Sequence, residues 1–254
     1  MADAYVTLRF YGPLNQCLRP DDRQRTLSKP LCQGATVKHV IEAAGVPHTE
    51  AALVLSDGVP VTLDHPLQGD ERIAVYPKFH SLDVSSLPSV QPVLPEAPRF
   101  ILDVHLGKLA GYLRMLGFDT LYSNNASDEE LAEIAEKEGR ILLTFDRGLL
   151  KRRQVTIGGL VFSRTAKTQL EEVMARFELW NKVQPLTRCM ACNGLLEEVD
   201  KAEILDKLPS RVAEDFDEFS QCRGCGRVYW EGSHFDRMQA LIQTIRDTRD
   251  APQP

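Results

Sequence analysis

Four of the six cysteines form two C-x-x-C pairs, a spacing that can place sulfur ligands around a metal ion. These cysteines are Cys189, Cys192, Cys222 and Cys225. Turn-forming residues follow each pair, Asn193-Gly194 after the first and Gly226 after the second. Two such knuckles complete a tetrahedral site of four thiolates, which is typical of structural zinc because no position is left open for a substrate. The sequence therefore predicts one structural zinc ion; unligated thiols or redox-active pairs are the alternative.

Three aspartates lie where a second kind of site is expected. Asp103 and Asp146 each follow an apolar run typical of a buried strand, and Asp128 begins a helix that leads into the second of these strands. Since ligands of open α/β sheets bind at the carboxyl ends of strands, we expect the three carboxylates to converge. Hard divalent ions such as Mg²⁺ or Mn²⁺ take oxygen ligands and can activate water for attack on a phosphodiester. The sequence therefore predicts a catalytic metal site.

Two of these aspartates also have a structural alternative. Asp128 could serve the helix dipole as the first helical residue. Asp146 precedes Arg147-Gly148 and could be a turn residue. Asp103 follows three apolar residues and is harder to explain in this way, so the metal site is predicted from the combination of the three.

Six basic residues near the aspartates are candidates for contacts with the phosphates of a nucleic acid. They are Lys108, Arg114, Arg147, Lys151, Arg152 and Arg153. Residues 99–185 carry 13 Lys and Arg against 12 Asp and Glu, whereas the whole chain has a formal net charge of −6. The overall acidity argues against a general nucleic-acid-binding protein. For any one of the six, a solvated charged surface is the alternative.

Strand and helix patterns alternate through residues 99–185, the region that must position these groups. The expected strands are 99–104, 118–122, 140–146 and 158–162, and the expected helices are 105–116, 127–138 and 168–180. Gly117 and Gly139 mark the ends of the first two helices. This alternation predicts a parallel sheet covered by helices on both faces.

The first 78 residues predict a separate, smaller domain. Strands are expected at 4–11, 25–31, 52–55 and 72–76, with one helix from Thr36 to Gly45. The order β-β-α-β-β on fewer than 80 residues is typical of a β-grasp domain. Residues 79–98 contain four prolines and several serines without strand or helix periodicity, which predicts a semi-extended linker.

Residues 186–254 contain both cysteine pairs and predict a zinc ribbon. The 29 residues between Cys192 and Cys222 exceed the common spacing, so we expect an excursion, with a helix near 202–208. A C-terminal helix is expected over about 233–248. No apolar run approaches the roughly 20 residues that cross a bilayer. Residues 1–5 lack the basic and apolar regions of a secretory signal, so none is expected. The C-x-x-C pairs favour a reducing compartment, so we expect a cytoplasmic protein that does not enter membranes.

Residues 99–236 resemble the Mut-seven C-terminal ribonuclease family, a PIN-like nuclease domain with a zinc ribbon. The resemblance is carried by four segments, Phe100–Asp103, Leu109–Asp119, Gly139–Arg147 and the ribbon from Arg188 to His234. It implies that RNA is the substrate and that Asp103, Asp128 and Asp146 correspond to metal-binding acids. Larger PIN domains carry a further acid with no clear counterpart here; Glu129 or Glu130 would be the substitutes.

The N-terminal region resembles the ubiquitin-like domain that is fused to this family, and also small sulfur-carrier proteins. The matching segments are Phe10–Asn15 and Ile73–Pro77. Sulfur carriers end in a free Gly-Gly, whereas this chain continues through Pro77-Lys78-Phe79 into the linker. The resemblance therefore implies a docking role, with a protein partner, rather than carrier chemistry.

The sequence thus predicts an α/β chain of four parts: a β-grasp domain (1–78), a linker (79–98), a PIN-like parallel-sheet nuclease domain (99–185), and a zinc ribbon with a C-terminal helix (186–254). The expected function is a ribonuclease that hydrolyses phosphodiester bonds with Mg²⁺ or Mn²⁺. The alternative is an RNA-binding or adaptor protein with a vestigial metal site.

Overall fold

The computed structural model of the 254-residue chain describes residues 4–79, 86–232, 235, 239–240 and 242–243. The chain divides into two compact units, Met1–Glu96 with Asn125–Val161, and Ala97–Asn124 with Phe162–Pro254. In the described part of the chain, no helix has the length and apolar character needed to span a membrane.

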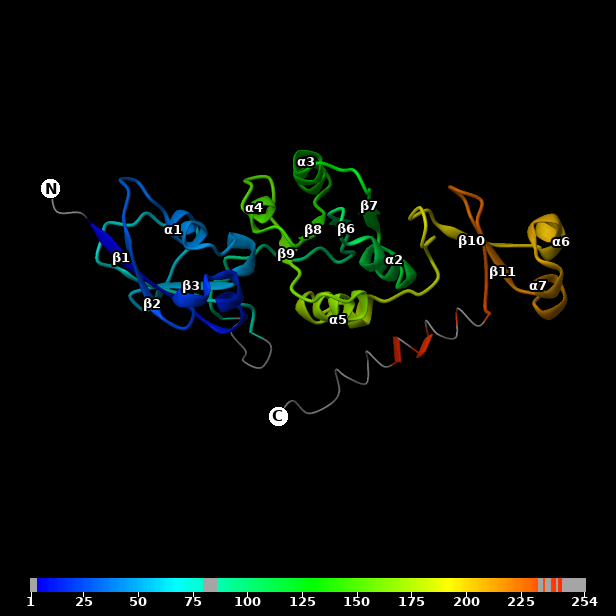
Figure 1. Cartoon of the computed structure of the whole chain (residues 1–254), viewed down its shortest axis with the longest axis horizontal. Helices are drawn as coiled ribbons and strands as arrows, with labels where there is room; N and C mark the ends of the chain where they lie inside the picture. Colours follow the sequence, from blue (N-terminus) through cyan, green and yellow to red (C-terminus); the bar gives the residue numbers. More distant parts are fainter. Residues whose placement is uncertain (1–3, 80–85, 233–234, 236–238, 241, 244–254) are drawn as a thin grey trace. The chain divides into compact units, whose positions relative to one another are not determined.

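The first unit begins with a five-stranded sheet in the order β2-β1-β5-β3-β4. Its strands are β1 (Tyr5–Phe10), β2 (Thr26–Pro30), β3 (Leu53–Ser56), β4 (Val59–Pro60) and β5 (Arg72–Tyr76). β1 pairs in parallel with β5 and antiparallel with β2, and β3 pairs antiparallel with both β4 and β5. Helix α1 (Val37–Ala44) completes the fold (Figure 1). This arrangement confirms the predicted β-grasp domain; the short strand β4 was not predicted.

Burial in the β-grasp domain follows the alternation seen in the sequence. Val6 and Leu8 on β1 and Val75 on β5 are fully buried, while their neighbours in the strands are partly exposed. Thr36 accepts a hydrogen bond from the His39 amide at the start of α1, and Gly45 ends the helix at a φ of 109°. A left-handed φ of this kind is accessible to glycine without strain, which explains why the helix stops there.

The first unit also contains a segment of alternating helices and strands from the middle of the chain. Its elements are α3 (Asp128–Glu138), β8 (Ile141–Thr144), α4 (Arg147–Leu150) and β9 (Gly158–Leu160). All four residues of β8 are buried, and β8 pairs in parallel with β9. Ser127 and Glu130 form a capping box at the start of α3, which satisfies amides that the first helical turn leaves without partners.

The second unit contains β6 (Phe100–Leu102), α2 (Gly107–Met115), β7 (Thr120–Tyr122) and α5 (Ala166–Arg176). β6 and β7 are parallel, and Leu102 lies opposite Tyr122. The rings of Phe118 and Phe177 both pack edge-on against Phe100, which is fully buried. The parallel pairing in both units confirms the α/β class. The strands and α2 are shorter than the sequence indicated, α3 has the predicted extent, and α5 begins and ends earlier than predicted.

The second unit ends in a three-stranded antiparallel sheet in the order β10-β11-β12. Its strands are β10 (Leu196–Val199), β11 (Phe219–Cys222) and β12 (Val228–Trp230). Between β10 and β11 the chain forms α6 (Lys201–Ile204), a 3₁₀ turn (Leu205–Lys207) and α7 (Ser210–Asp215), where one helix was expected. Most of the C-terminal helix expected over 233–248 lies outside the described residues.

The described part of the chain contains four further 3₁₀ turns, three in the first unit and one in the second. They are η1 (Gly12–Cys17), η2 (Pro20–Asp22), η3 (His48–Glu50) and η4 (Trp180–Lys182). All three residues of η3 are buried, although they are polar or ionisable. Buried polar groups are normally satisfied by hydrogen bonds, so η3 marks a place where another part of the chain supplies partners.

Candidate functional site

The four predicted zinc ligands lie together at the end of the ribbon. The four sulfur atoms all lie within 4.8 Å of one another; they belong to Cys189, Cys192, Cys222 and Cys225. Two cysteines, Cys189 and Cys222, are buried, and the other two are exposed. A backbone hydrogen bond closes each turn. The Asn193 amide donates to the Cys189 carbonyl, and the Gly226 amide donates to the Cys222 carbonyl. Four thiol donors at this spacing fit a tetrahedral zinc ion.

Backbone geometry at the knuckles explains the turn residues of the motif. Asn193 has a φ of 70° and Gly226 a φ of 72°, both in the left-handed region that Gly and Asn tolerate. A β-carbon on Gly194 would lie 2.8 Å from the Cys222 sulfur. Gly194 is therefore required for the approach of the two knuckles.

The electrostatics of the cysteine cluster favour thiolate. Burial opposes ionisation of Cys189, but hydrogen bonds from the Tyr229 hydroxyl and from backbone amides outweigh it and lower the Cys189 pKa to about 6. The Tyr229 hydroxyl lies 3.1 Å from the Cys189 sulfur, and the pKa of Tyr229 is raised by burial and by this contact. A thiolate held in this way is ready to bind a metal at neutral pH.

Arg114, which was predicted to bind substrate, is almost fully buried, with 5% of its surface exposed. Its guanidinium donates from Nε to the Thr120 carbonyl at 2.9 Å and from Nη1 to the carbonyls of Met190 and Ala191 at 3.2 and 2.9 Å. Met190 and Ala191 lie between the first two cysteines. Arg114 thus joins helix α2 and strand β7 to the first zinc knuckle.

Asn193 makes a second link between the knuckle and β7. Its side-chain oxygen accepts from the Thr120 amide at 2.9 Å, and its nitrogen donates to Asp119 Oδ1 at 2.9 Å. Arg188 lies 3.4 Å from the other oxygen of Asp119. Asp119 and Thr120 are therefore held to the ribbon, which gives a structural reason for the aspartate that ends the Leu109–Asp119 segment.

Asp103 lies one residue beyond β6 and is 6% exposed. Its Oδ1 accepts from the His105 amide at 2.7 Å and lies 3.3 Å from His105 Nδ1. The Tyr122 hydroxyl donates to the Val104 carbonyl at 2.9 Å, and a β-carbon on Gly107 would lie 2.7 Å from that hydroxyl. The turn after β6 is therefore tightly built around a buried carboxylate.

Asp128 and Asp146 lie in the first unit, and both are exposed. Asp128 is the first residue of α3. Asp146 caps α4, because its Oδ1 accepts from the Gly148 amide at 2.6 Å. Asp128 is thus placed to interact with the dipole of α3, and Asp146 is the N-cap residue at the turn before α4. Whether they share an ion with Asp103, which lies in the other unit, stays a prediction.

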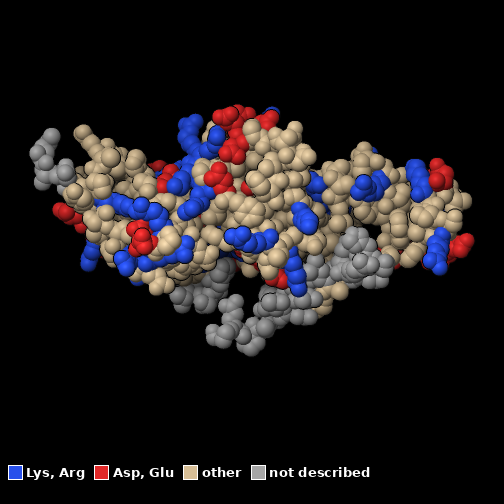
Figure 2. Space-filling model, viewed as in Figure 1, with Lys and Arg blue, Asp and Glu red and all other residues tan. Residues whose placement is uncertain are grey.

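The two glutamates considered as a further acid have different environments. Hydrogen bonds from the backbone and the side chain of Ser127 lower the pKa of Glu130 and commit its carboxylate to the capping box. Glu129 is 77% exposed at its side chain and lies 3.7 Å from Arg152. In Figure 2, carboxylates gather over α3 at the top of the view, with basic side chains beside them.

The remaining basic candidates divide into two groups. Lys108 and Arg153 are exposed, and Arg152 pairs with Glu129. Arg147, which is also exposed, and Lys151, which is partly buried, donate to backbone carbonyls of the β-grasp domain. Their partners could not be inferred from the sequence, because more than 100 residues separate them along the chain.

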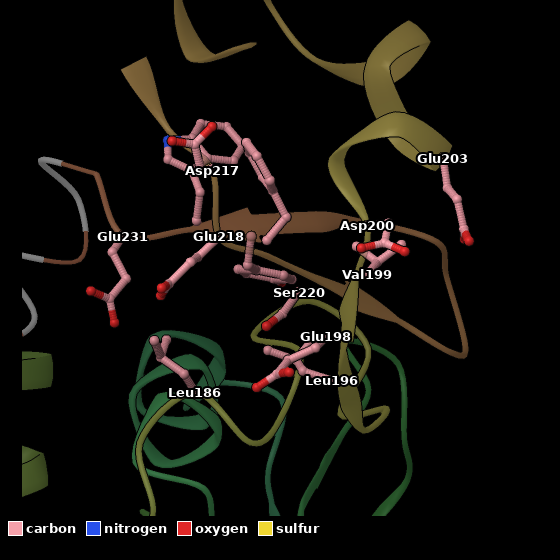
Figure 3. Close-up of a pocket in the computed structure, with 13 residues that line it drawn as sticks. Leu186, Leu196, Glu198, Val199, Asp200, Glu203, Asp217, Glu218, Ser220 and Glu231 are labelled. Carbon is pink, nitrogen blue, oxygen red and sulfur yellow. The ribbon is translucent and has the colours of Figure 1, made fainter. Parts of the chain in front are cut away.

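The ribbon carries a cavity of about 620 Å³ that the sequence did not indicate. Six carboxylates line it together with Phe219, Tyr229 and Trp230 (Figure 3). These acidic residues are Glu198, Asp200, Glu203, Asp217, Glu218 and Glu231. Such a lining repels phosphate groups, so this face of the ribbon is not suited to the backbone of a nucleic acid.

The family comparison covers both halves of the chain. Residues 98–242, more than half of the sequence, match the model of the Mut7-C RNAse domain, and residues 3–83 match the Mut7-C ubiquitin model. The chain belongs to the Mut7-C RNAse family. This membership confirms the resemblance seen in the sequence and indicates nuclease function for the Mut7-C domain. The cysteine cluster lies within the matched range.

Comparison with solved structures gave matches that cover 30% of this Mut7-C protein. A crystal structure of small archaeal modifier protein 1 of Haloferax volcanii is 18% identical and covers 30% of this chain and 99% of its own, with a TM-score of 0.25. A second structure of SAMP1 from Haloferax volcanii is 15% identical and covers 30% and 96%, with a TM-score of 0.24. Comparison with curated proteins gave no match.

Proposed function

We propose that this Mut7-C protein is a ribonuclease that hydrolyses RNA phosphodiester bonds with a divalent ion, Mg²⁺ or Mn²⁺, held by Asp103, Asp128 and Asp146 in a PIN-like core. The observation that carries the proposal is the match of residues 98–242 to an RNase family. The position of Asp103 directly after β6 supports it, because ligands of open α/β sheets bind at the carboxyl ends of strands. An ion bound there would supply Lewis-acid activation of water and of the scissile phosphate.

The chain's own groups would orient the reaction. His105 N–H fixes one oxygen of Asp103, and Gly148 N–H fixes one oxygen of Asp146, so neither carboxylate is a freely rotating side chain. Carboxylates held by backbone amides keep their charge and their direction. Glu129 is the better candidate for a further ligand, since Glu130 is engaged in the capping box.

Exposed basic groups would bind the phosphates on either side of the scissile bond. Lys108 on α2 and Arg153 after α4 are exposed and are our first candidates, followed by Arg152, which precedes Arg153 in the chain. Arg114 is assigned a structural role, because its donors reach three carbonyls in the interior. The four cysteines would hold one structural zinc ion, which maintains the ribbon. We place the protein in the cytoplasm, where such thiols stay reduced.

A second function, RNA binding without cleavage, is favoured by one observation. Glu130 is occupied by its capping interaction, so a full set of four acids is incomplete unless Glu129 contributes. In that case the ubiquitin-like domain would recruit a protein partner, and the Mut7-C domain would hold RNA for it.

The two functions are separated by cleavage of labelled single-stranded RNA with Mn²⁺ by the wild type and by Asp146→Asn. The ribonuclease predicts cleavage that EDTA stops and that the variant lacks. Glu133→Gln is the matched control, because Glu133 is an exposed acid of α3 that the site does not use. Cleavage that persists in EDTA or in Asp146→Asn contradicts the proposal. RNA binding by wild type without cleavage supports the adaptor.

A further inference from the structure

The β-grasp domain is bonded to the α4–β9 segment of the nuclease region within the first unit. Strand β9 pairs with β8 on one side. On its other side, the Leu160 amide donates to Glu50 Oε1 at 2.8 Å. Glu50 belongs to η3 and is 6% exposed. The Glu50 carboxylate thus accepts a hydrogen bond from an amide that β8 does not use. This contact is specific, because burying either group without its partner would cost free energy.

His48 makes the second contact of η3. Its Nε2 lies 3.0 Å from the Val155 carbonyl and its Nδ1 lies 2.7 Å from Glu42 Oε1. The imidazole thus links α1, η3 and the segment that leads into β9. Val155 is itself fully buried. His48 and Glu50 together fix the β-grasp domain to this segment.

Two basic residues that were expected to bind RNA, Arg147 and Lys151, also contact the β-grasp domain. Arg147 Nη1 donates to the Cys17 carbonyl, and Lys151 Nζ donates to the Glu42 carbonyl at 2.6 Å. Burial lowers the pKa of Lys151, although the charge of Glu42 opposes this. Both acceptors are neutral carbonyls, which hold a cation less strongly than the charged oxygens of phosphate do.

We propose that RNA and the β-grasp domain compete for Arg147 and Lys151. With the β-grasp domain bound to the α4–β9 segment, both cations are directed to its carbonyls. When the domain is released, they become phosphate ligands directly after Asp146. The inference rests on the proposed function, whose regulation it describes: the β-grasp domain restrains RNA binding.

The first test uses the unmodified full chain. Exchange of the Leu160 amide, whose proton Glu50 accepts, reports release of the β-grasp domain. Titration with single-stranded RNA in buffer without added Mg²⁺ or Mn²⁺ should accelerate this exchange, since linkage requires that binding and release favour each other. Unchanged or stronger protection of Leu160 at saturating RNA would overturn the inference.

The second test releases the domain by substitution. His48→Ala/Glu50→Ala should bind the RNA about tenfold more tightly, with a salt dependence steeper by about 1.4, since each of two added phosphate contacts adds about 0.7 on a single strand. Adding Arg147→Ala/Lys151→Ala should remove this gain. In the chain with His48 and Glu50 intact, the same two substitutions should change affinity by less than about twofold.

Asp57→Ala is the control, because Asp57 is an exposed residue of the β-grasp domain that pairs with Arg72. It should leave both RNA affinity and Leu160 exchange unchanged. A released variant that binds RNA no more tightly than wild type contradicts the competition. The experiments separate failure of this inference from failure of the proposed function. Competition without metal-dependent cleavage contradicts the proposed function. Cleavage with unchanged Leu160 exchange at saturating RNA contradicts this inference.

Discussion

The cysteine cluster and the three aspartates show two ways in which the chain builds a site. Each pair of cysteines lies on one tight turn, and a single antiparallel sheet connects the two turns. The aspartates follow or begin separate elements, and Asp103 lies in a different unit from the other two. A site made by local turns is specified by motif spacing, whereas a site made from distant elements depends on how the elements assemble. The predictions below test this difference, from the largest effect to the smallest.

Loss of one zinc ligand should have the largest effect. Cys222→Ser should reduce bound zinc from about one ion per chain to none and destabilise the ribbon, because metal binding contributes folding free energy at such small sites. Metal analysis and amide exchange measure the two effects. Cys32→Ser is the control, since Cys32 is an exposed cysteine outside the cluster. Zinc retained by Cys222→Ser would show that the cluster is not the metal site.

Arg114→Met should destabilise the second unit by about 3 kcal/mol, because three carbonyls lose a charged donor in the interior. Denaturant unfolding of the zinc-loaded protein measures this. Arg153→Met, at an exposed position, should change the free energy of unfolding by less than about 0.5 kcal/mol. Equal effects at the two positions would contradict the structural role of Arg114.

Ser127→Ala should cost about 1 kcal/mol of stability, because the capping box at α3 loses its side-chain acceptor. It should also remove the hydroxyl donor to Glu130, whose carboxylate then keeps only the hydrogen bond from the backbone amide of residue 127. If Glu130 then serves as an additional metal ligand, Mn²⁺ affinity would rise; our account assigns that role to Glu129 and predicts no such increase. The free energy of unfolding and Mn²⁺ titration provide the two readouts.

A final prediction, outside this ranking by size, concerns the pH dependence of the zinc-free protein's stability. The Cys189 pKa falls from 9.0 to about 6 in the folded chain, so its thiolate adds stability as the pH rises from about 6 to 9. The pKa of Cys192 is raised: the Gly194 amide lowers it, but burial and the neighbouring thiols outweigh this. Its ionisation therefore reduces stability above pH 9. Zinc-free unfolding measured across this range should show a maximum near pH 9, and stability that falls steadily from pH 6 would contradict it.

The parts that the sequence predicted best are those whose determinants lie close together. The β-grasp order followed from alternating strands with one capped helix, and the capping box at Ser127 followed from the spacing of Ser and Glu. The cysteine cluster followed from its two motifs. In each case a few neighbouring residues set the geometry, so no knowledge of distant contacts was needed.

The basic residues were harder to interpret because charge alone does not specify a partner. Arg114 and Arg153 are the same residue type, and the sequence does not distinguish them. In the structure, Arg114 is buried and donates to three carbonyls, whereas Arg153 is exposed. Lys151 contacts Glu42, which lies 109 residues away. The acidic cavity of the ribbon likewise combines residues from β10, β11 and β12 and the segments beside them, which only the fold brings together.

The most direct test of the nuclease account is the binding of Mn²⁺ to the zinc-loaded full chain, followed by its paramagnetic signal. We predict one exchangeable Mn²⁺ site that Asp103→Asn and Asp146→Asn each weaken at least tenfold, while Glu133→Gln leaves it unchanged, since removing one carboxylate ligand removes a charged oxygen from the ion. Mn²⁺ binding that is the same in all four proteins would contradict the proposed aspartate site.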